Sequence, residues 1–385
     1  MKKVALRLVI VALCISVISV FSFTGCKEPE VVVETVTETV VETVTETVEV
    51  EKVEEEFTPY YKTEEFTPYV ELEEWELSQP DDEGTVQPVD RFPEETIKIG
   101  VLGGQTNPFF DAVFIDVEAS NVELASHNAI VDWVIPGATF GSGDYGEAIE
   151  TMVTKEYNVI CTMIFNDGMI PFVDNAVDKG VVCALWCVNS ESDNKGLCYV
   201  GQDLYQGGVS SAHELAKLLG GEGKVAVITG FFSLYGHEQR RLGFEDTIKA
   251  EYPDIEIVGT VENLDQADTA FNQANDFLTA NPDLDAKHLK ADGPTGAIEA
   301  IIQAEKTDDV KFTCYYVPEL APYIEADQCQ AAIAQNAFAE GHDPAVRSFN
   351  YLMEGILPPA KMLWTEAFVV TPDNIEEFLA SGQGA

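Results

Sequence analysis

From residue 96 onward, short apolar runs rich in β-branched residues alternate with longer runs whose apolar residues recur at intervals of three and four. The first pattern predicts buried strands and the second predicts amphipathic helices. The predicted strands are TIKIGVL (96–102), AIVDWVI (129–135), NVICTMI (158–164), VVCALW (181–186), KVAVITG (224–230), IEIVGTV (255–261), AKHLKAD (286–292) and VKFTCYY (310–316). The predicted helices span 107–126, 144–155, 170–179, 205–220, 237–251, 268–280, 295–305 and 318–328.

This alternation predicts an α/β fold, with parallel sheets covered by helices on both faces. The units are too many for one compact sheet, and the stretch is longer than a single core comfortably supports. The pattern pauses at CYVGQDLYQGG, around Gly201, and starts again at KVAVITG. We therefore predict two similar lobes, with a ligand held between them by loops at the carboxyl ends of the strands.

The first residues, MKKVALRLVIVALCISVISVFSFTGC, combine a basic start with an apolar stretch that is too short for a stable membrane span. They predict a secretory signal peptide over residues 1–25. The end of this stretch, FTGC, resembles the lipobox of bacterial lipoproteins, which implies that Cys26 becomes the lipidated N-terminus of the mature chain and anchors it to a membrane. An ordinary signal peptide with a chance cysteine is the alternative.

Residues 26–95 are acidic and repetitive. VETVTETV occurs at 33–40 and again at 41–48, and EFTPY recurs at 56–60 and 65–69. Valine and threonine are weak helix formers, and the glutamates lack lysine partners. We predict a disordered, self-repelling tether between the membrane and the folded domain, with transient strand or helix as the alternative.

The net charge of −45 at pH 7 excludes nucleic acid as a partner, because phosphate contacts need clustered lysine and arginine. Cys161, Cys183 and Cys314 lie in apolar runs and are predicted to be small buried hydrophobic residues. Cys187 and Cys198 flank a polar loop and could form a disulfide, although the sequence leaves the pairing open. Without CxxC or HExxH spacing, we predict neither a metal site nor a cofactor.

The loop after the first predicted strand, GQTNPFFDAV (104–113), lacks the GxGxxG spacing of a dinucleotide site. It presents side chains in place of a glycine backbone. Aromatic rings such as Phe109 and Phe110 pack against the C–H faces of sugar rings, and the amide of Asn107 can donate to and accept from hydroxyl groups. Alternatively, one of the two phenylalanines is simply a core residue of the following helix.

Several stretches, in order, resemble the sugar-binding proteins of bacterial ABC transporters, of the ribose-binding type. They are IGVLGGQTNPFF, VGQDLYQGGVSSAHELAKLL, GEGKVAVITG, HEQRRLGF, FLTANPDLDAKHLKADGPTGAIEAI and QAAIAQNAFAEGHDPAV. The resemblance implies the type I periplasmic binding protein fold, with two doubly wound lobes joined by a three-strand hinge that closes on a sugar. It implies an N-terminal lobe of residues 96–201 and 336–365, and a C-terminal lobe of residues 202–335 and 366–385.

The resemblance also implies ligand contacts. Asn107, Phe109 and Phe110 match sugar-binding residues of the family, and Gln335 matches a glutamine at the third crossing. Arg240 matches an arginine whose planar fork binds sugar hydroxyls, with the neighbouring Arg241 as the alternative.

At several positions the chain departs from ribose binders. Trp186 stands near an expected Asp-Arg pair, Tyr316 stands near an expected aspartate, and Leu264 replaces a hinge aromatic residue. Asp292 follows the position of a family Asn or Asp, which here is Ala291. Because charge-assisted hydrogen bonds are the strong partners of hydroxyls, we expect ribose to bind poorly and a deoxy, methylated, glycosidic or nucleoside-like sugar, or a cyclitol, to bind better.

We therefore predict a monomeric, extracytoplasmic binding lipoprotein that is anchored to the cell membrane on its periplasmic or outer face. It would deliver a sugar-like ligand to an ABC transporter permease. A binding protein linked to a sensor or chemoreceptor is the alternative. An enzyme is not predicted, because no nucleophile, base and acid have a recognisable spacing. A transcriptional regulator would carry a DNA-binding domain where the secretory signal stands.

Overall fold

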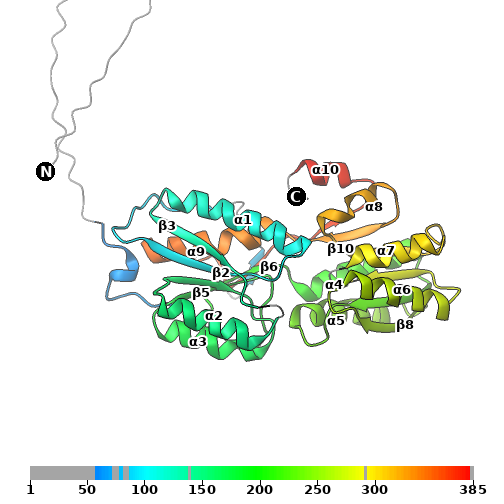
Figure 1. Ribbon diagram of the computed structural model, residues 1–385, viewed down its shortest axis with the longest axis horizontal. Coiled ribbons are helices and arrows are strands. Elements are labelled where there is room, and N and C mark those ends of the chain that lie inside the picture. Colours follow the sequence, from blue (N-terminus) through cyan, green and yellow to red (C-terminus); the bar gives the residue numbers. More distant parts are fainter. Residues whose placement is uncertain (1–56, 72–77, 81–85, 138–139, 290–292, 382–385) are drawn as a thin grey trace, which may run out of the picture. The chain divides into compact units, whose positions relative to one another are not determined.

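Figure 1 shows the computed structural model of the chain, which describes residues 57–71, 78–80, 86–137, 140–289 and 293–381. The signal peptide, Cys26 and the repeats before residue 57 lie outside the described residues. From residue 56 onward the chain forms one unit with two sheets, and helices cover both faces of each sheet. The α/β class with two sheet-built lobes is confirmed.

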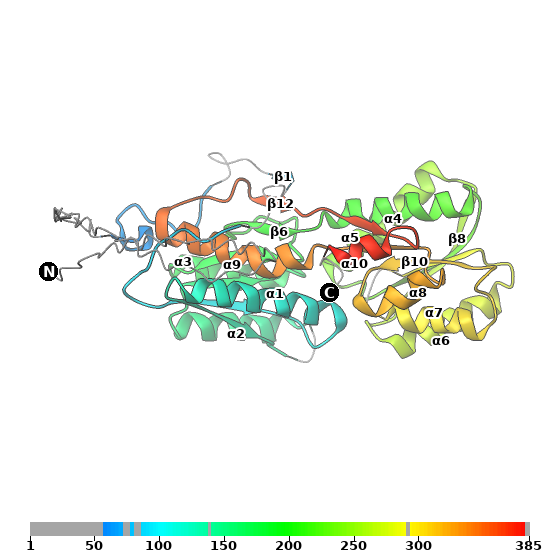
Figure 2. The same cartoon turned by 90° about the horizontal axis from the view of Figure 1, so that it is seen from above.

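The first lobe contains a seven-stranded sheet in which every pair of neighbouring strands is parallel. Its strands, in spatial order, are β1 (Ser78–Pro80), β12 (Met362–Trp364), β6 (Tyr199–Gly201), β5 (Val182–Trp186), β4 (Val159–Thr162), β2 (Ile97–Leu102) and β3 (Ala129–Val134). Helices α1 (Pro108–Ala125) and α9 (Ala337–Glu354) lie side by side on one face, and α2 (Ser142–Thr154) and α3 (Ile170–Asp178) cover the other (Figures 1 and 2).

The second lobe contains a six-stranded sheet that is parallel except at one edge, where β13 runs antiparallel to β11. Its strands, in spatial order, are β13 (Phe368–Val370), β11 (Ala331–Ala334), β10 (Lys311–Tyr315), β9 (Ala286–Leu289), β7 (Gly223–Thr229) and β8 (Ile255–Glu262). Its helices are α4 (Leu204–Leu219), α5 (Tyr235–Glu251), α6 (Ala267–Ala280), α7 (Pro294–Gln303), α8 (Ala321–Glu325) and α10 (Ile375–Ala380).

The chain passes between the two sheets three times among the described residues. The passages lie between β6 and α4, between β11 and α9, and between β12 and β13. The strands of each lobe therefore come from separate parts of the chain. The loops after the carboxyl ends of β2, β4 and β5 belong to one lobe, and those after β10 and β11 start from the other.

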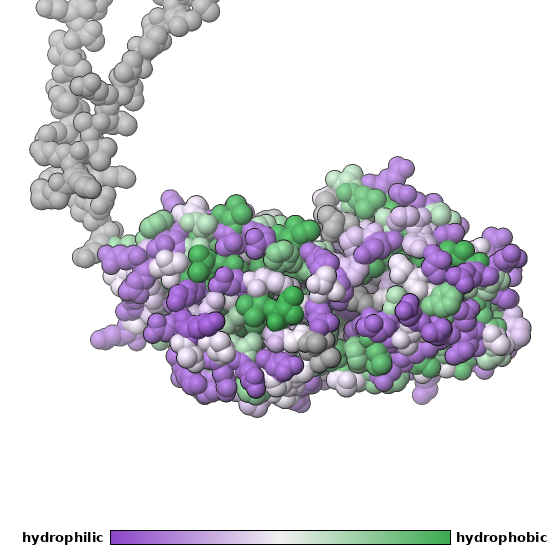
Figure 3. Space-filling model, in the orientation of Figure 1, coloured by the Kyte–Doolittle hydropathy of each residue, from purple (hydrophilic) through white to green (hydrophobic). Residues whose placement is uncertain are grey.

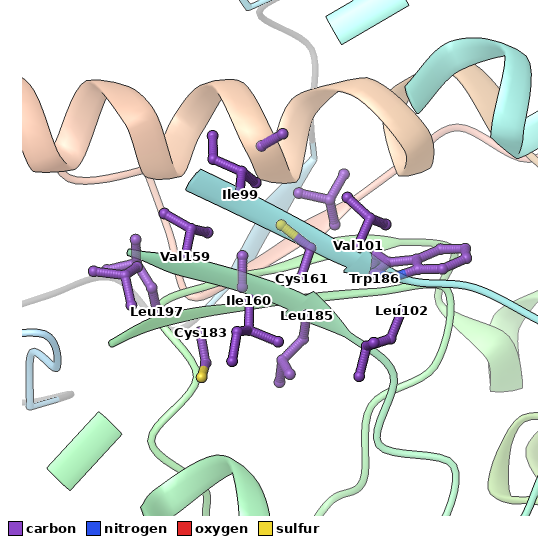
Figure 4. Close-up of a cluster of buried hydrophobic side chains, with 14 of the residues drawn as sticks. Ile99, Val101, Leu102, Val159, Ile160, Cys161, Cys183, Leu185, Trp186 and Leu197 are labelled. Carbon is purple, nitrogen blue, oxygen red and sulfur yellow. The ribbon is translucent and has the colours of Figure 1, made fainter. Parts of the chain in front are cut away.

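The core of the first lobe explains why its strands read as continuous apolar runs. Figure 4 shows side chains from β2, β4 and β5 pointing to both faces of the sheet, and all of these strands are buried on both sides. Parallel strands in this position have no polar face. Cys161 on β4, Cys183 on β5 and Cys314 on β10 are buried, as predicted from their apolar surroundings.

The predicted tether over residues 26–95 is wrong at its C-terminal end, because much of the chain after residue 56 is folded onto the first lobe. The Tyr60 ring packs edge-on against Tyr351 of α9, with centroids 5.5 Å apart, and the Tyr351 hydroxyl donates a 2.6 Å hydrogen bond to the Thr67 carbonyl. Asn350 holds Val89 by a 2.8 Å bond, and β1 pairs with β12. The aromatic residues of the EFTPY repeats pack on the first lobe, and this packing holds the segment in place despite its negative charge.

Helix α9 was not predicted as a helix. Its residues from Ala339 to Met353 are all buried, although many are polar, because the sheet, α1 and the N-terminal segment enclose it. Gly341 and Pro344 lie inside it, and these residues usually mark the end of a helix in a sequence.

In the described ranges, no helix has the length and apolar character that crossing a membrane requires.

Lys287 on β9 is the most costly residue of the second core. Its side chain is fully buried, and among the described residues its ammonium has no hydrogen-bond partner. Burial, together with the charge of Lys306, lowers the pKa of Lys287 to about 7. The pKa is lower folded than unfolded, so the ionised form destabilises the fold. The cost is complete below pH 7 and disappears as pH rises toward the ordinary value of 10.5.

Replacing this charge should stabilise the protein in a pH-dependent way. We expect Lys287→Met to raise the free energy of unfolding by as much as ~4 kcal/mol at pH 6, since one pKa unit corresponds to about 1.36 kcal/mol. The gain should shrink steadily toward pH 10. Urea denaturation at pH 6, 8 and 10 measures it, with Lys249→Met on the exposed face of α5 as the control. A gain that is equal at every pH would mean that packing, and not charge, is responsible.

Candidate functional site

A cavity lies where the loops at the carboxyl ends of strands from both sheets meet. The space between its walls is about 730 Å³ when the part open to solvent is counted. Its lining residues are Asn107, Phe109, Phe110, Phe140, Met163, Phe165, Cys187, Val188, Leu234, Gly236, His237, Arg240, Asp265, Tyr315, Tyr316, Val317 and Gln335.

The loop after β2 contributes Asn107, Phe109 and Phe110. Asn107 caps α1, because its side-chain oxygen accepts a 2.8 Å hydrogen bond from the Phe110 backbone N–H, and Pro108 occupies the first helical position. With the oxygen used by the helix, Asn107 offers a ligand its amide NH₂ group. The helix start therefore positions a donor at the cavity.

The two phenylalanines have different surroundings. Phe109 packs against apolar residues of both lobes. Phe110 is only 6% exposed, and its ring lies 6.0 Å, edge-on, from that of Trp186. A Cβ at Gly104 would lie 2.2 Å from the Phe110 ring, so glycine is needed there for the ring to pack. Phe110 thus belongs to the core and to the cavity lining at once.

Trp186 does not line the cavity. Its side chain is fully buried behind Phe110 and Trp133, inside the core of the first lobe. Trp186 was expected to contact a ligand directly, but this position does not support such a contact. Its side chain instead supports the Phe110 ring, which does face the cavity.

Arg240 enters the cavity from α5. Its guanidinium donates a hydrogen bond to Gln335 Oε1 and lies 4.2 Å from the centre of the Tyr315 ring. Helix α5 packs so closely on α4 that a Cβ at Gly208 would lie 2.2 Å from the Arg240 carbonyl oxygen. This packing fixes the position of Arg240 relative to the cavity. The side chain is 7% exposed, which leaves it in a low-dielectric setting where charge-assisted hydrogen bonds are strong.

Arg241, the alternative to Arg240, points elsewhere. It pairs with Glu238 and, at 2.6 Å, with Glu245 on its own helix. These are the i,i+3 and i,i+4 pairs of a helix surface. The structure therefore places Arg240, and not Arg241, in the cavity.

His237 and Asp265 line the cavity and were missed in the sequence. His237 Nδ1 accepts a 3.1 Å hydrogen bond from the Phe231 N–H, so the ring proton sits on Nε2, which lies 3.9 Å from Asp265 Oδ1. Burial, aided by the charge of Arg240, lowers the pKa of His237 to about 3, so the ring is neutral at physiological pH. His237 opens the stretch HEQRRLGF, in which only the arginines were considered as ligand contacts. Asp265 belongs to no quoted stretch, and it follows Leu264 in a left-handed turn that no sequence pattern indicates.

Of the remaining residues expected at the site, some line the cavity and others do not. Tyr316, after β10, and Gln335, after β11, line the cavity, and the Tyr316 ring is held edge-on by Phe378. Asp292 lies outside the described residues, as does Cys26. Leu264 is 45% exposed and is not in the lining.

The two walls of the cavity differ in chemistry. The wall from the first lobe is almost entirely apolar apart from Asn107, and it consists mainly of Phe109, Phe110, Phe140, Met163, Phe165 and Val188. The wall from the second lobe and from the passage between β11 and α9 carries His237, Arg240, Asp265 and Gln335. Gln335 was expected at the third crossing, but this passage is the second along the chain. Such a cavity can hold a small molecule with one apolar face and an edge of hydroxyl groups.

The periplasmic binding protein domain matches residues 101–353, and the chain belongs to this family. No curated protein matches the chain. Its architecture is the type I periplasmic binding protein fold, which several solved structures share.

Three of these structures illustrate the likeness. GanP, a glucose-galactose binding protein from Geobacillus stearothermophilus, is 20% identical with a TM-score of 0.66 over 73% of this chain and 99% of its own. A periplasmic solute binding protein of an ABC transporter from Actinobacillus succinogenes, with bound D-allose, is 22% identical with a TM-score of 0.66 over 73% of this chain and 100% of its own. XylFII in a complex with LytSN is 20% identical with a TM-score of 0.65 over 73% and 99%. At these identities the likeness establishes the fold.

We expect Arg240→Ala to weaken ligand binding by roughly 1.5–3 kcal/mol, the usual range for a hydrogen bond to a charged group. Arg241→Ala is the matched control, because it removes the same charge from the next position of α5, and it should leave affinity within about 0.5 kcal/mol. Calorimetric titration of both variants with the tightest-binding sugar of the panel given below makes the comparison. Equal losses of affinity in the two variants would mean that Arg241 also belongs to the binding site.

Phe109→Ala should reduce binding more than stability, because Phe109 lies between the two lobes and is only half-buried. Phe110→Ala should cost stability as well, by about 3–5 kcal/mol, since it removes a buried aromatic ring. Titration and thermal unfolding of the two variants separate the effects. If Phe109→Ala loses as much stability as Phe110→Ala, its main role is in the core.

Proposed function

We propose that this protein is an extracytoplasmic substrate-binding lipoprotein that captures a small sugar or sugar-like ligand between its lobes and delivers it to an ABC transporter permease. The observation that carries the proposal is the convergence of aromatic rings and hydroxyl-binding groups from two lobes on one cavity. GanP and the D-allose complex, which share the fold, are described as sugar or solute binding proteins. The similarity to these proteins favours a binding protein over an enzyme.

The ligand class follows from the asymmetry of the walls. Phe109, Phe110 and Phe140 suit a deoxy, methylated, glycosidic or nucleoside-like sugar, or a cyclitol, because these ligands present an apolar face. Tyr315 and Tyr316 end the strand where ribose binders have a carboxylate. Asp265 supplies one carboxylate from another position, so the pocket can still bind a pair of hydroxyls with a charged acceptor.

Capture would work by a shift in population. Open lobes sample closure, and a ligand that contacts Phe109 on one lobe and Arg240 on the other stabilises only the closed form. The closed form is then what a permease recognises. Lipidation at Cys26 would keep the monomeric protein beside that permease, with the residues before the folded unit as the link.

A second candidate is a binding lipoprotein that reports to a sensor or chemoreceptor. Hydrophobic side chains interrupt the polar surface of the first lobe over α1, where Phe114, Ile115 and Val122 are 40%, 60% and 75% exposed (Figure 3). Exposed apolar residues of this kind suit a protein partner. XylFII, which shares the fold, is described in complex with another protein, LytSN.

A ligand panel tests the proposed function. We expect at least one of L-fucose, methyl β-D-galactoside, adenosine and myo-inositol to raise the melting temperature and to bind more tightly than D-ribose in calorimetric titration. D-glucose, D-galactose, D-arabinose, D-xylose and D-allose complete the panel. Tight ribose binding would refute the assigned ligand class, and a panel without any binder would refute the sugar-binding function.

A further inference from the structure

A cluster of buried polar groups lies directly behind the cavity, where the chain crosses between the lobes. Gln202 follows β6 at the first crossing, and Glu340 lies in the first turn of α9, just after the crossing from β11. Both are 1% exposed, and neither lines the cavity. Arg240 reaches the same place from the second lobe. The cluster thus joins groups from both lobes.

Several atoms of this cluster are unsatisfied. Among the described residues, the two carboxylate oxygens of Glu340, both amide atoms of Gln202 and Arg240 Nε have no hydrogen-bond partner. Buried polar atoms without partners are rare and costly, and each calls for an explanation. A buried carboxylate with no donor is the most expensive of them.

The surroundings of Glu340 disfavour its charge. Burial raises the pKa of Glu340 to about 8, and the charge of Arg240, the Gln202 backbone and the Cys187 side chain oppose this shift only in part. Tyr199, from β6, faces the cluster as well; burial raises the pKa of Tyr199 well above 10, with Glu340 as a secondary cause, so it stays neutral.

We propose that Glu340 is a positioning residue for Arg240, and that it takes up one proton from solvent when the lobes close on a ligand. Ligand capture is thereby linked to proton uptake. The proposal rests on the proposed function, because it assumes a ligand that closes the lobes. It adds a residue that does not touch the ligand and a dependence on pH that the sugar contacts themselves do not require.

The chemistry balances with one proton from water. An open form would hydrate the Glu340 carboxylate and bring its pKa toward 4.5, the ordinary value of a solvated glutamate. Closure removes that water, and the carboxylate becomes a carboxylic acid with one proton from solvent. The acid gains an O–H donor, which the unsatisfied Gln202 Oε1 can accept, and it no longer carries a charge beside Arg240. Arg240 then keeps its guanidinium for Gln335 and the cavity.

The sign of the pH dependence follows from the higher pKa of Glu340 in the closed form. Affinity should fall as pH rises from 4.5 toward 8 and then level off. His237 acts in the opposite sense, because its pKa is lowered from 6.5 to about 3 in the closed form, and half of a solvated histidine is still protonated at pH 6.5. Above pH 7.5, the slope reports Glu340.

The experiment is calorimetric titration of the full chain with the tightest binder of the panel at pH 6.5, 7.5 and 8.5. The pKa values of 4.5 and 8 for Glu340, opposed by the shift of His237, give an expected loss of affinity of about fourfold between pH 6.5 and 7.5 and about threefold over the next unit. At pH 7, titrations in two buffers of different ionisation enthalpy should show the net uptake of about 0.7 proton per ligand. Glu340→Gln, a neutral mimic of the acid, should lose this decline in affinity and show no proton uptake.

Asp116→Asn is the matched control. Asp116 is another carboxylate of the first lobe, on α1, with a pKa raised to about 6 by burial, and it lies outside the cavity. This variant should keep the full slope above pH 6.5. A role of Glu340 in folding alone would change affinity by the same factor at every pH. An unchanged slope in Glu340→Gln, or no slope in the natural chain, overturns the proposal.

A second measurement separates this proposal from the proposed function. If no sugar of the panel binds, the sugar-binding function fails, and small-angle X-ray scattering of the ligand-free chain decides about Glu340. The radius of gyration should then rise between pH 6.5 and 8.5 in the natural chain and stay constant in Glu340→Gln. A constant value in both would overturn the linkage.

Discussion

A guanidinium buried between two sheets is the constraint on which the site depends. Arg240 is almost fully buried, so its donors need partners inside the protein. Gln335 at the passage after β11 and the face of Tyr315 on its own lobe supply part of this need. In the proposed function, the rest is left to a ligand that contacts both lobes. A charge that is fully served only when two lobes meet makes their closure depend on what lies between them.

The sequence was informative wherever burial is uniform. The strands 97–102, 159–162, 182–186 and 223–229 are buried on both faces, so their apolar runs are unbroken and easy to recognise. The short strands β1, β6, β11, β12 and β13 carry too few residues for a pattern, and they were not predicted. Helix α9 was missed because Gly341 and Pro344 stand inside it, and these residues usually mark the end of a helix.

The cavity was accessible from the sequence to a similar degree. Asn107, Phe109, Arg240, Tyr316 and Gln335 come together in the lining, and all except Tyr316 stand in stretches that resemble a known family. Their contacts with a ligand stay a prediction. His237 also stands in such a stretch and was overlooked there. Asp265 stands in none, and its approach to His237 depends on a left-handed turn that no local pattern encodes. Trp186 lies close to the cavity, but its side chain is buried in the core behind the lining residues.

The docking of residues 57–71 on the first lobe has a mechanical consequence. Tyr60 and Thr67 hold on to the C-terminal part of α9, near Tyr351, while the hinge lies at the other end of that helix, about 27 Å away for its 18 residues. Any pull on the leading segment is therefore borne by one lobe alone, far from the pivot. The second lobe does not bear this force, so it can move relative to the first lobe without moving the attached leading segment.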